Sequence, residues 1–255
     1  MGRLDQRVVI VTGGGYGIGR AYCLGLAREG ARVVVADIDE KAALRVADEI
    51  AGQGGQAIAT HTDVADEESV ALMARQTLDR FGSVDVLINN AAVYIHPVPL
   101  TYLPFDQLPV AEWERVMAVN LKGVFLCCRA VAPVMKNNRM GKIINISSGT
   151  VQNGTVGMSP YVTSKAGVIG LTRVLARELG EFGVTVNAVA PGLTLSDDDP
   201  AASDHKRHDL RAQARCLKRI ETPEDLVGTI LFLSSPDSDF ITGQTIAVNG
   251  GASFI

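Results

Sequence analysis

Two side chains suited to proton transfer lie four residues apart in the stretch YVTSK, residues 161–165. On a helix, Tyr161 and Lys165 share one face, because residues i and i+4 lie one turn apart. A phenol has an ordinary pKa near ~10, and an ammonium at about 4 Å can lower it toward ~7. The pair therefore predicts an acid/base tyrosine. An ordinary amphipathic turn, with Ser164 in a structural role, explains the pair alone equally well.

A glycine-rich turn follows the first apolar run of the chain. Residues 12–19 have the sequence TGGGYGIG and lie between a predicted strand and a predicted helix. Glycines permit a tight turn and close approach of the backbone to a pyrophosphate, and a helix N-terminus favours negative charge. The turn predicts a dinucleotide site, although the sterics of a strand-to-helix turn alone also favour glycine.

Asp37 ends the second predicted strand, where dinucleotide-binding folds place an acid. Such a carboxylate accepts both hydroxyls of an adenosine ribose and repels a 2′-phosphate. No Arg or Lys occupies positions 38–40, and position 16 is Tyr, so the pattern favours NAD(H) over NADP(H). A solvated Asp at a strand end is the simpler alternative. Asp63 and Val64 end the third strand, where they would reach the adenine.

Short apolar runs alternate with helical patterns along the whole chain. The predicted strands are 7–13, 31–37, 56–63, 84–91, 141–148, 184–192 and 244–251. The predicted helices include 40–51, 66–81, 111–136, 160–181 and 223–234. Several strands are apolar at nearly every position, as strands covered on both faces are. The sequence predicts one α/β domain, 1–255, with a Rossmann-like doubly wound fold: a seven-stranded, mostly parallel sheet with helices on both faces.

Two segments interrupt this alternation, and both follow predicted strands. Residues 93–110 are rich in proline and aromatic residues and would form a wall of the substrate pocket. Residues 193–211 are polar and would form a lid. The wall has no Arg or Lys, so we expect an apolar or aromatic secondary alcohol and its ketone as substrate, contacted by Tyr94 and His96. Core or interface packing is an alternative role for the other aromatic residues of the wall.

Composition and charge exclude several other classes. The formal net charge is −4 and there is no Lys/Arg-rich run, so we expect no nucleic-acid partner. We expect no membrane partner and a cytoplasmic protein, because no signal-peptide pattern or uninterrupted apolar span is present. The four cysteines lie in helical-looking apolar patterns and are expected to be buried and reduced. His205 and His208 lack further ligands nearby, so we expect no metal site.

Eight motifs in this order and spacing make the sequence resemble the short-chain dehydrogenase/reductase family over essentially its whole length. They are TGGGYGIG (12–19), Asp37, NNAA (89–92), Asn120 in VNLKGVF, the serine of INISS, YVTSK (161–165), PGLTLS (191–196) and FITGQTIAVNGG (240–251). The resemblance implies a nicotinamide-dependent oxidoreductase. It also implies a homotetramer, as is common in the family.

The resemblance implies a catalytic tetrad of Asn120, Ser148, Tyr161 and Lys165. Ser148, rather than Ser147, stands at the family spacing from the tyrosine and would hydrogen-bond the substrate oxygen together with Tyr161. Asn120 would hold a water that links Lys165 to solvent, and Thr194 would lie near the nicotinamide carboxamide. The implied NAD contacts are Thr12, Gly13, Gly17, Ile18, Gly19, Asp37, Ile38, Asp63, Val64, Asn89, Ala91, Tyr161, Lys165, Pro191, Gly192 and Thr194.

Several functions within and beyond the family stay open. The tail and the lid are similar to those of aryl-alkyl alcohol dehydrogenases. The 93–110 segment is longer than in the reductases of fatty-acid synthesis, which favours the alcohol substrate over a 3-ketoacyl thioester. A sugar or polyol dehydrogenase is a further alternative, and a catalytically dead nucleotide-binding regulator or an epimerase of the extended branch is another. The intact tetrad argues against the regulator, and the short chain against the epimerase.

Overall fold

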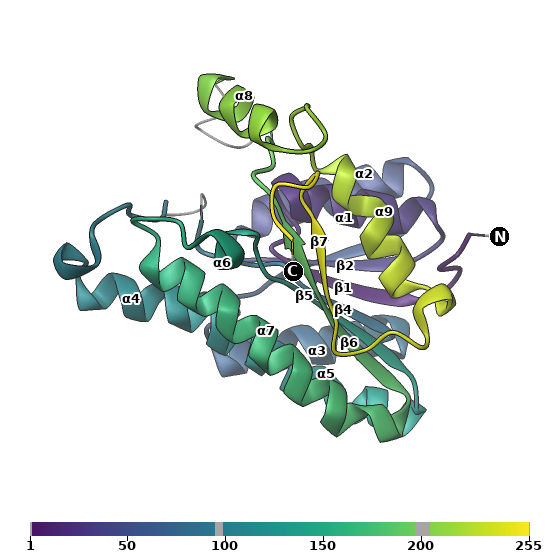
Figure 1. Ribbon diagram of the computed structural model, residues 1–255. Coiled ribbons are helices and arrows are strands. Elements are labelled where there is room, and N and C mark those ends of the chain that lie inside the picture. The colour runs from purple at the N-terminus through teal and green to yellow at the C-terminus, as the bar shows by residue number, and fades with distance from the viewer. Residues whose placement is uncertain (1, 95–98, 197–204, 255) are drawn as a thin grey trace.

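A parallel sheet of seven strands forms the centre of the molecule (Figure 1). The computed structural model describes residues 2–94, 99–196 and 205–254, so positions 95–98 of the predicted wall, His96 among them, and 197–204 of the predicted lid lie outside the described residues. The strands are β1 (Val8–Thr12), β2 (Arg32–Asp37), β3 (Gln56–His61), β4 (Val86–Asn89), β5 (Gly141–Ile146), β6 (Val184–Pro191) and β7 (Thr245–Val248). Each described strand pair is parallel, and the predicted fold class is confirmed.

The strand order places a crevice at the carboxyl ends of two central strands. It is β3-β2-β1-β4-β5-β6-β7, so the chain runs outward from β1 in one direction and then resumes on the other side at β4. Crossovers from β1 and from β4 therefore leave in opposite directions, and a crevice opens at the carboxyl ends of these two neighbouring strands. The glycine turn follows β1 and the NNAA motif begins at the end of β4. The topology thus brings both motifs to one place.

Helices cover both faces of this sheet. They are α1 (Gly17–Arg28), α2 (Glu40–Gly52), α3 (Glu67–Phe81), α4 (Val110–Met117), α5 (Gly123–Asn138), α6 (Thr150–Asn153), α7 (Ser159–Leu179), α8 (His205–Ala214) and α9 (Glu224–Ser234). Short 3₁₀ turns span Phe105–Gln107 (η1), Gly180–Phe182 (η3) and Pro236–Ser238 (η5). Figure 1 shows α8 standing apart from the helices that pack on the sheet. It belongs to the predicted lid.

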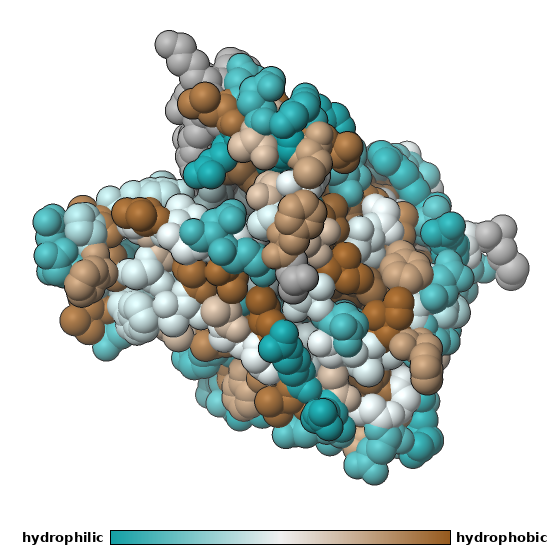
Figure 2. All heavy atoms as spheres, in the orientation of Figure 1, coloured by the Kyte–Doolittle hydropathy of each residue, from teal (hydrophilic) through white to brown (hydrophobic). Residues whose placement is uncertain are grey.

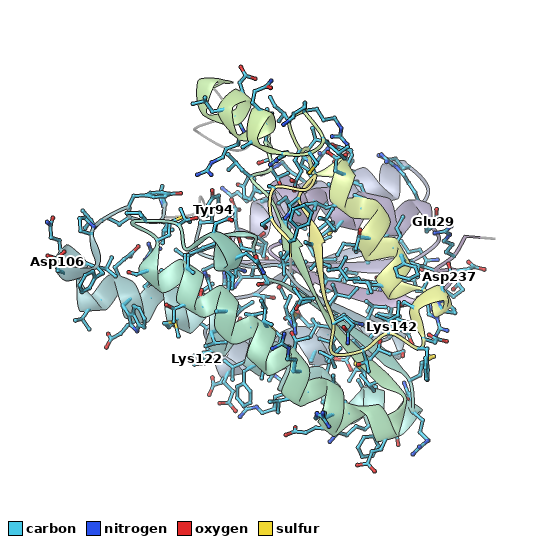
Figure 3. All side chains as sticks on the ribbon, viewed as in Figure 1. Glu29, Tyr94, Asp106, Lys122, Lys142 and Asp237 are labelled. Atoms are coloured by element: carbon cyan, nitrogen blue, oxygen red, sulfur yellow. The ribbon has the colours of Figure 1, made fainter. Side chains whose placement is uncertain are left out.

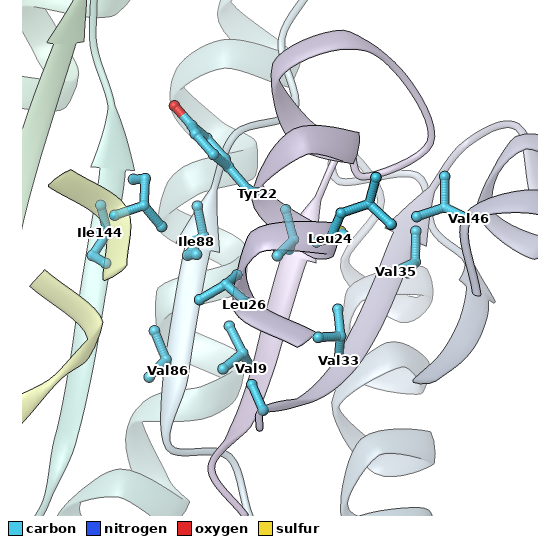
Figure 4. Close-up of a cluster of buried hydrophobic side chains, with 14 of the residues drawn as sticks. Val9, Tyr22, Leu24, Leu26, Val33, Val35, Val46, Val86, Ile88 and Ile144 are labelled. Atoms are coloured by element: carbon cyan, nitrogen blue, oxygen red, sulfur yellow. The ribbon is translucent and has the colours of Figure 1, made fainter. Parts of the chain in front are cut away.

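Alternate residues of each strand supply two separate cores. Val9 and Val11 of β1 pack in a cluster with side chains of α1, α2 and α9, part of which Figure 4 shows. Ile10, between them, packs in a second cluster with side chains of α3, α5 and α7. Since successive side chains of a strand point to opposite faces, a continuous apolar run covers both faces at once. This explains the uninterrupted apolar strands of the sequence.

Two helices begin where their acidic residues predict. Asp39 caps α2 by accepting a hydrogen bond from the Ala42 N–H at 3.1 Å, and Asp66 caps α3 by accepting one from the Glu68 N–H at 3.1 Å. Each carboxylate satisfies a backbone donor that the first turn leaves unpaired. Gly82 ends α3 with φ of 77°, a left-handed conformation that favours glycine.

The predicted helix 111–136 differs in the structure. It is divided into α4 and α5 by a π-helical turn at Ala118–Lys122 (η2), which contains Asn120. A π turn inserts one residue into a helix and turns the following side chains to a new direction, and it is frequent at functional sites. At this turn the buried Asn120 side chain accepts a hydrogen bond from the Val93 N–H at 2.7 Å.

The same helical run has the composition of a membrane span. Val110–Asn138 is the one run in the described part of the chain that is long and apolar enough to cross a membrane, by length and composition alone. The core helix of a soluble protein meets the same criteria. In this fold α5 packs on β4 and β5, so its apolar residues serve the second core.

The cysteines divide into two environments. Cys23, Cys127 and Cys128 are buried, as predicted, whereas Cys216 is exposed in the turn after α8. The prediction of burial was wrong for Cys216 because the apolar pattern around it belongs to a loop that folds against Gly251. Among the residues the structure describes, no group of three or more His, Cys, Asp or Glu side chains is arranged to hold a metal ion.

Candidate active site

A cavity of about 500 Å³ opens at the carboxyl ends of the strands. Its lining comes from the segments at the ends of β1 to β7, from α6 and α7, and from the lid. The predicted site residues that line it are Gly13, Gly17, Ile18, Gly19, Asp37, Ile38, Asp63, Val64, Ala91, Tyr94, Ser148, Tyr161, Lys165, Pro191, Gly192 and Thr194. The volume is in the range of pockets that enclose small molecules.

The glycine turn has the shape of a cradle at one end of this cavity. Gly13 and Gly17 have φ of 63° and 48°, in the left-handed region that favours glycine. A Cβ on Gly19 would overlap the carbonyl oxygen of Gly13, so no larger residue fits there without moving backbone. The first N–H groups of α1 lie beside these glycines and create a site for an anion. The turn therefore fits a pyrophosphate.

Asn90 holds the cradle in place, and the sequence analysis missed it. Its Nδ2 donates to the carbonyl oxygens of Thr12 at 3.1 Å and Gly13 at 2.9 Å. Asn90 is the second asparagine of NNAA, whereas the sequence analysis assigned the first. The second asparagine of this motif was the sequence feature that could have indicated Asn90.

Thr12 and Asn89 do not line the cavity, which corrects two predicted cofactor contacts. The Thr12 hydroxyl accepts hydrogen bonds from the N–H groups of Asn90 and Ala91, which tie β1 to the segment after β4. Asn89 points into the interior, where its Nδ2 donates to Asn145 Oδ1 at 2.8 Å. Both side chains are almost fully buried, and their polar groups join neighbouring strands instead of facing a ligand.

Asp37 lies at the end of β2 with a carboxylate held by the backbone. Its two oxygens accept hydrogen bonds from the N–H groups of Gly15 at 2.9 Å and Asp39 at 3.0 Å. Burial raises the pKa of this carboxyl above its usual value, and those N–H groups oppose the shift. Because a carboxylate has about four lone-pair sites, capacity for ribose hydroxyls is left.

A second acid and a cation accompany Asp37. The Tyr16 hydroxyl donates to Asp39 Oδ2 at 2.6 Å, and both residues line the cavity. The Arg45 guanidinium lies 5.5 Å from the centre of the Tyr16 ring. Arg45 lies beyond positions 38–40, where the sequence was examined for a cation. Helix α2 brings its side chain back over the Tyr16 ring about one and a half turns after position 40.

Tyr161, Lys165 and Ser148 meet at the other end of the cavity. Tyr161 and Lys165 come from the start of α7, and Ser148 follows β5. The Lys165 Nζ donates to the Ile146 carbonyl oxygen at 2.7 Å and lies 5.7 Å from the centre of the Tyr161 ring. The neighbouring Ser147 is committed elsewhere, since its hydroxyl donates to the Lys165 carbonyl oxygen at 2.9 Å.

The pKa values of this pair depart from the sequence analysis. Burial raises the pKa of Tyr161 to about 12, and a hydrogen bond with Ser148 only partly opposes it. Burial lowers the pKa of Lys165 to about 8. Burial opposes the expected fall of the tyrosine pKa toward neutrality, because removal from water disfavours both charged forms. The Lys165 ammonium does not offset the free-energy cost of forming a buried Tyr161 phenolate.

Asn120 connects three segments beneath the cavity without lining it. Its Oδ1 accepts from the Val93 N–H, and its Nδ2 donates to Ser164 Oγ at 3.3 Å. Ser164 in turn donates to the Tyr161 carbonyl oxygen at 2.7 Å. Asn120 therefore links the start of the wall and the first turn of α7, and Ser164 has the structural role predicted for it. The water relay through Asn120 stays a prediction.

Among the described residues of the wall, Tyr94 brings an aromatic ring to the cavity. The Tyr94 ring, labelled in Figure 3, lies 5.4 Å from the Tyr161 ring, centre to centre, at an interplanar angle of 42°. Val93 and Met158 extend this apolar side. Tyr102 and Phe105 are exposed and do not line the cavity, so the aromatic residues of the wall have different surroundings.

An ion pair anchors the wall to α4. Arg115 contacts Glu112 through Nε–Oε2 at 2.8 Å, donates to the Pro99 carbonyl oxygen at 3.3 Å, and Glu112 accepts from the Thr101 N–H at 3.2 Å. The lid contributes Arg211 of α8 to the lining. Arg211 was not among the predicted site residues.

The segment after β6 is held by a second, buried ion pair. Arg215 and Glu221 are 3% and 4% exposed and lie 3.2 Å apart, Nη2 to Oε2. The other carboxylate oxygen, Oε1, accepts from the Gly192 N–H and from the Thr194 hydroxyl, each at 3.0 Å. Arg215 also donates to the Leu193 carbonyl oxygen at 2.6 Å. No motif of the sequence pointed to this pair.

The comparisons with known proteins agree with this geometry. A family profile described as enoyl-(acyl carrier protein) reductase matches residues 13–253. The chain is 43% identical over 244 residues to the 3-oxoacyl-[acyl-carrier-protein] reductase FabG of Staphylococcus aureus, an alignment covering 95% of this chain and 96% of that one. The chain belongs to the short-chain dehydrogenase/reductase family. It is therefore an oxidoreductase, and family members use a nicotinamide cofactor.

Two further similarities span nearly the whole chain. The (2S)-[(R)-hydroxy(phenyl)methyl]succinyl-CoA dehydrogenase subunit BbsD of Thauera aromatica is 38% identical over 253 residues, which covers 98% of each chain. A short-chain type dehydrogenase/reductase from Mycobacterium marinum has a similar solved structure, with a TM-score of 0.89, 32% identity, and coverage of 99% of this chain and 97% of that one.

Proposed function

We propose that this chain transfers a hydride between NAD(H) and a secondary alcohol or its ketone. The alcohol or ketone belongs to the acyl chain of a thioester and lies next to the thioester group. The observation that carries the redox chemistry is the meeting of Ser148, Tyr161 and Lys165 in one cavity with the glycine cradle. The names of two relatives, a 3-oxoacyl-carrier-protein reductase and a hydroxyacyl-CoA dehydrogenase, support the thioester. The thioester alternative thereby takes precedence over the simple aromatic alcohol favoured by the sequence.

The residues present fit a nicotinamide dinucleotide. Gly13, Gly17 and Gly19 would hold the pyrophosphate, Asp37 the adenosine ribose and Lys165 the nicotinamide ribose. Ile38, Asp63, Val64 and Ala91 would contact the adenosine half, and Ile18, Pro191, Gly192 and Thr194 the rest. The bound nicotinamide supplies or accepts the hydride. Two acids, Asp37 and Asp39, disfavour a 2′-phosphate, which supports NAD(H) over NADP(H).

The proton transfer falls to Tyr161. Its hydroxyl would donate a proton to the substrate oxygen in reduction and take it back in oxidation, with general acid/base catalysis contributing about 10²–10⁴-fold. Ser148 Oγ would hydrogen-bond the same oxygen as its charge changes. Lys165 would hold the nicotinamide ribose hydroxyls and, as proposed from the resemblance, would connect to solvent through a water held by Asn120.

Arg211 supports a charged substrate. It brings a guanidinium to the cavity from the lid, where it can pair with a phosphate or carboxylate of an acyl carrier. The apolar side formed by Tyr94, Val93 and Met158 suits the acyl part, including an aromatic one. His96 lies outside the described residues, and its substrate contact stays a proposal.

A substrate panel at the nicotinamide absorbance tests this proposal. We expect acetoacetyl-CoA and 3-oxoacyl thioesters with NADH to exceed 1-arylethanols with NAD by at least tenfold in kcat/KM, and NADPH to be the poorer donor. Arg211→Ala should lower kcat/KM for the thioester and leave 1-arylethanols unchanged. Tyr161→Phe should lose about 10³-fold in kcat with NADH binding retained. Preference for 1-arylethanols or for sugars, or no turnover at all, would contradict the assignment.

An aromatic secondary alcohol is the second candidate. The Tyr94 ring beside Tyr161 favours it, because it gives the reacting carbon an aromatic neighbour. This candidate predicts that Tyr94→Ala raises KM for 1-arylethanols more than for acetoacetyl-CoA. A dead nucleotide-binding regulator predicts NADH binding without turnover of any member of the panel.

We also propose that the chain assembles as a cytoplasmic homotetramer. An apolar groove lined by Trp113, Met117, Leu121, Phe125 and Leu171 crosses α4, η2, α5 and α7. Glu114 and Lys122 lie at the same groove. In a two-fold arrangement the acid of one copy meets the lysine of the other, so the groove is self-complementary in charge as well as apolar. A second copy of the chain is the occupant that these features favour.

A further inference from the structure

The loop after β6 carries a hydroxyl whose hydrogen-bond direction is fixed by the protein. Thr194 Oγ1 lies 3.0 Å from Glu221 Oε1 and 3.4 Å from the Gly192 carbonyl oxygen. Both neighbours are acceptors, so the Thr194 hydrogen is committed to them. Thr194 therefore presents lone pairs, and not its hydrogen, to the cavity that it lines.

Glu221 holds the whole loop and not only this hydroxyl. The same Oε1 accepts from the Gly192 N–H at 3.0 Å, and the Glu221 carbonyl oxygen accepts from the Leu195 N–H at 2.8 Å. Residues 194 and 221 form an isolated parallel β-bridge. The carboxylate thus reaches the loop through its side chain and its backbone at once, from the segment between α8 and α9.

Arg215 orients this carboxylate and partly opposes the rise that burial causes in its pKa. Its Nη2 lies 3.2 Å from Glu221 Oε2 and donates to the Leu193 carbonyl oxygen on the same loop. A Cβ on Gly192 would overlap the Glu221 carboxylate and press on the Arg215 guanidinium, so the pair is packed directly against the loop. With one oxygen facing a cation and the other facing two donors, the carboxylate has little freedom to turn.

We propose that Glu221, oriented by Arg215, is a positioning residue that makes Thr194 an acceptor for the carboxamide N–H₂ of the nicotinamide. The proposal rests on the proposed function, because it needs a nicotinamide at this loop. A hydroxyl fixed as an acceptor recognises the amide nitrogen and not the amide oxygen, so it sets the orientation of the nicotinamide ring. The adenosine half of the cofactor lies at the other end of the cavity and is independent of this contact.

The test compares two ligands that differ by the nicotinamide. NADH binding, measured by fluorescence, should weaken about tenfold in Glu221→Gln, the loss expected for one hydrogen bond. ADP-ribose, which lacks the nicotinamide, should bind within twofold of the wild type by calorimetry. In this variant Arg215 keeps the amide oxygen, so an amide N–H₂ faces the Gly192 N–H and Thr194. Glu224→Gln, an exposed carboxylate on α9, is the matched control and should change neither ligand.

Variants of Thr194 keep the test decisive where Glu221→Gln does not fold. Thr194→Val should show the same loss for NADH alone, and Thr194→Ser, which keeps the hydroxyl, should restore wild-type binding. The losses from Thr194→Val and Glu221→Gln should not add in the double variant. Equal weakening of NADH and ADP-ribose would show a structural role only and overturn the proposal, as would unchanged NADH binding in Thr194→Val. A wild-type protein that binds ADP-ribose and NADH equally would contradict the proposed function instead.

Discussion

Tyr161 and Lys165 are both held toward their uncharged forms. Burial raises the pKa of the phenol to about 12 and lowers the pKa of the ammonium to about 8. A phenol with this pKa is protonated throughout the neutral range and is a weaker acid than an ordinary phenol, so burial alone makes it a poor proton donor. Oxidation needs the positive charge that an oxidised nicotinamide brings, which lowers the pKa of Tyr161.

The lysine shift has a consequence for stability that can be measured. The Lys165 pKa is about 8 in the folded protein, against an ordinary 10.5. Between these values the unfolded chain holds a proton that the folded protein has released, so the free energy of unfolding rises with pH across this window. Above pH 10.5 the shifted pKa of Lys165 costs no stability. The free energy of unfolding falls as the pH is lowered from there to about 8, where the full cost has developed. Below that window the buried lysine is a constant cost.

Replacing Lys165 by methionine should remove this pH dependence. We expect the free energy of unfolding of the wild type, relative to Lys165→Met, to increase by about 2 kcal/mol between pH 7 and pH 10. Urea unfolding of both proteins at several pH values gives the difference. Costs of the substitution that do not depend on pH, such as the lost contact with Ile146, cancel in this slope. Parallel pH profiles for the two proteins would mean that Lys165 keeps its ordinary pKa.

Among the elements, the turn between β1 and α1 is constrained by contact and not only by backbone conformation. Gly19 would place a Cβ on the Gly13 carbonyl oxygen, whereas Gly170, exposed on α7, would place one in open space. Gly19→Ala should therefore lower stability by about 1–3 kcal/mol and abolish NADH binding. Gly170→Ala should raise stability by about 0.5–1 kcal/mol and leave binding intact. Thermal unfolding and NADH fluorescence separate the two, and a Gly19→Ala protein that binds NADH normally would refute the cradle.

The elements also show which parts of the site a sequence can predict. The order of strands and helices, the cradle and the Tyr161–Lys165 pair follow from local patterns: apolar periodicity, glycine clustering and helical spacing. The π turn at Asn120 does not, and the hydrogen bond that Asn120 makes there joins it to Val93, which is distant in the sequence. A polar residue at a strand end can face a ligand or the interior, which is why Asn89 was assigned in place of Asn90.

Charged residues that reach the site only through the tertiary fold were its least predictable part. Arg45 returns over Tyr16 only because α2 packs beside the glycine turn. Arg215 and Glu221 are close in sequence, but they matter because they meet the loop after β6, which no local pattern reveals. The effect of burial on a pKa also depends on the tertiary fold and cannot be predicted from a local pattern. The low pKa expected for Tyr161 considered its nearest charge and not the water it loses.

At the scale of the whole molecule, the two ends of the sheet have different roles. The carboxyl ends of the strands carry the cavity. Toward the opposite end, Lys142 pairs with Asp239 at 2.7 Å and donates to Ser238, tying β5 to the segment around η5 (Figure 3). Figure 2 shows hydrophobic atoms over the end formed by η1 and α4, where Phe105 and Val110 are exposed. That end projects beyond the sheet, next to the apolar groove.

The groove across α4, α5 and α7 gives the last prediction, which concerns assembly. Phe125 is 43% exposed in this groove, and its contact with a second copy would bury it. A glutamate there would place a charge in an apolar interface, at a cost that exceeds the gain from most single contacts. If the chain forms the proposed homotetramer, Phe125→Glu should therefore reduce it to species of half that mass or less, measured by light scattering after size-exclusion chromatography. Leu44→Glu, equally exposed on α2 away from the groove, is the matched control and should leave the mass unchanged. A tetramer that survives Phe125→Glu would place the interface elsewhere, and a monomeric wild type would rule out the assembly.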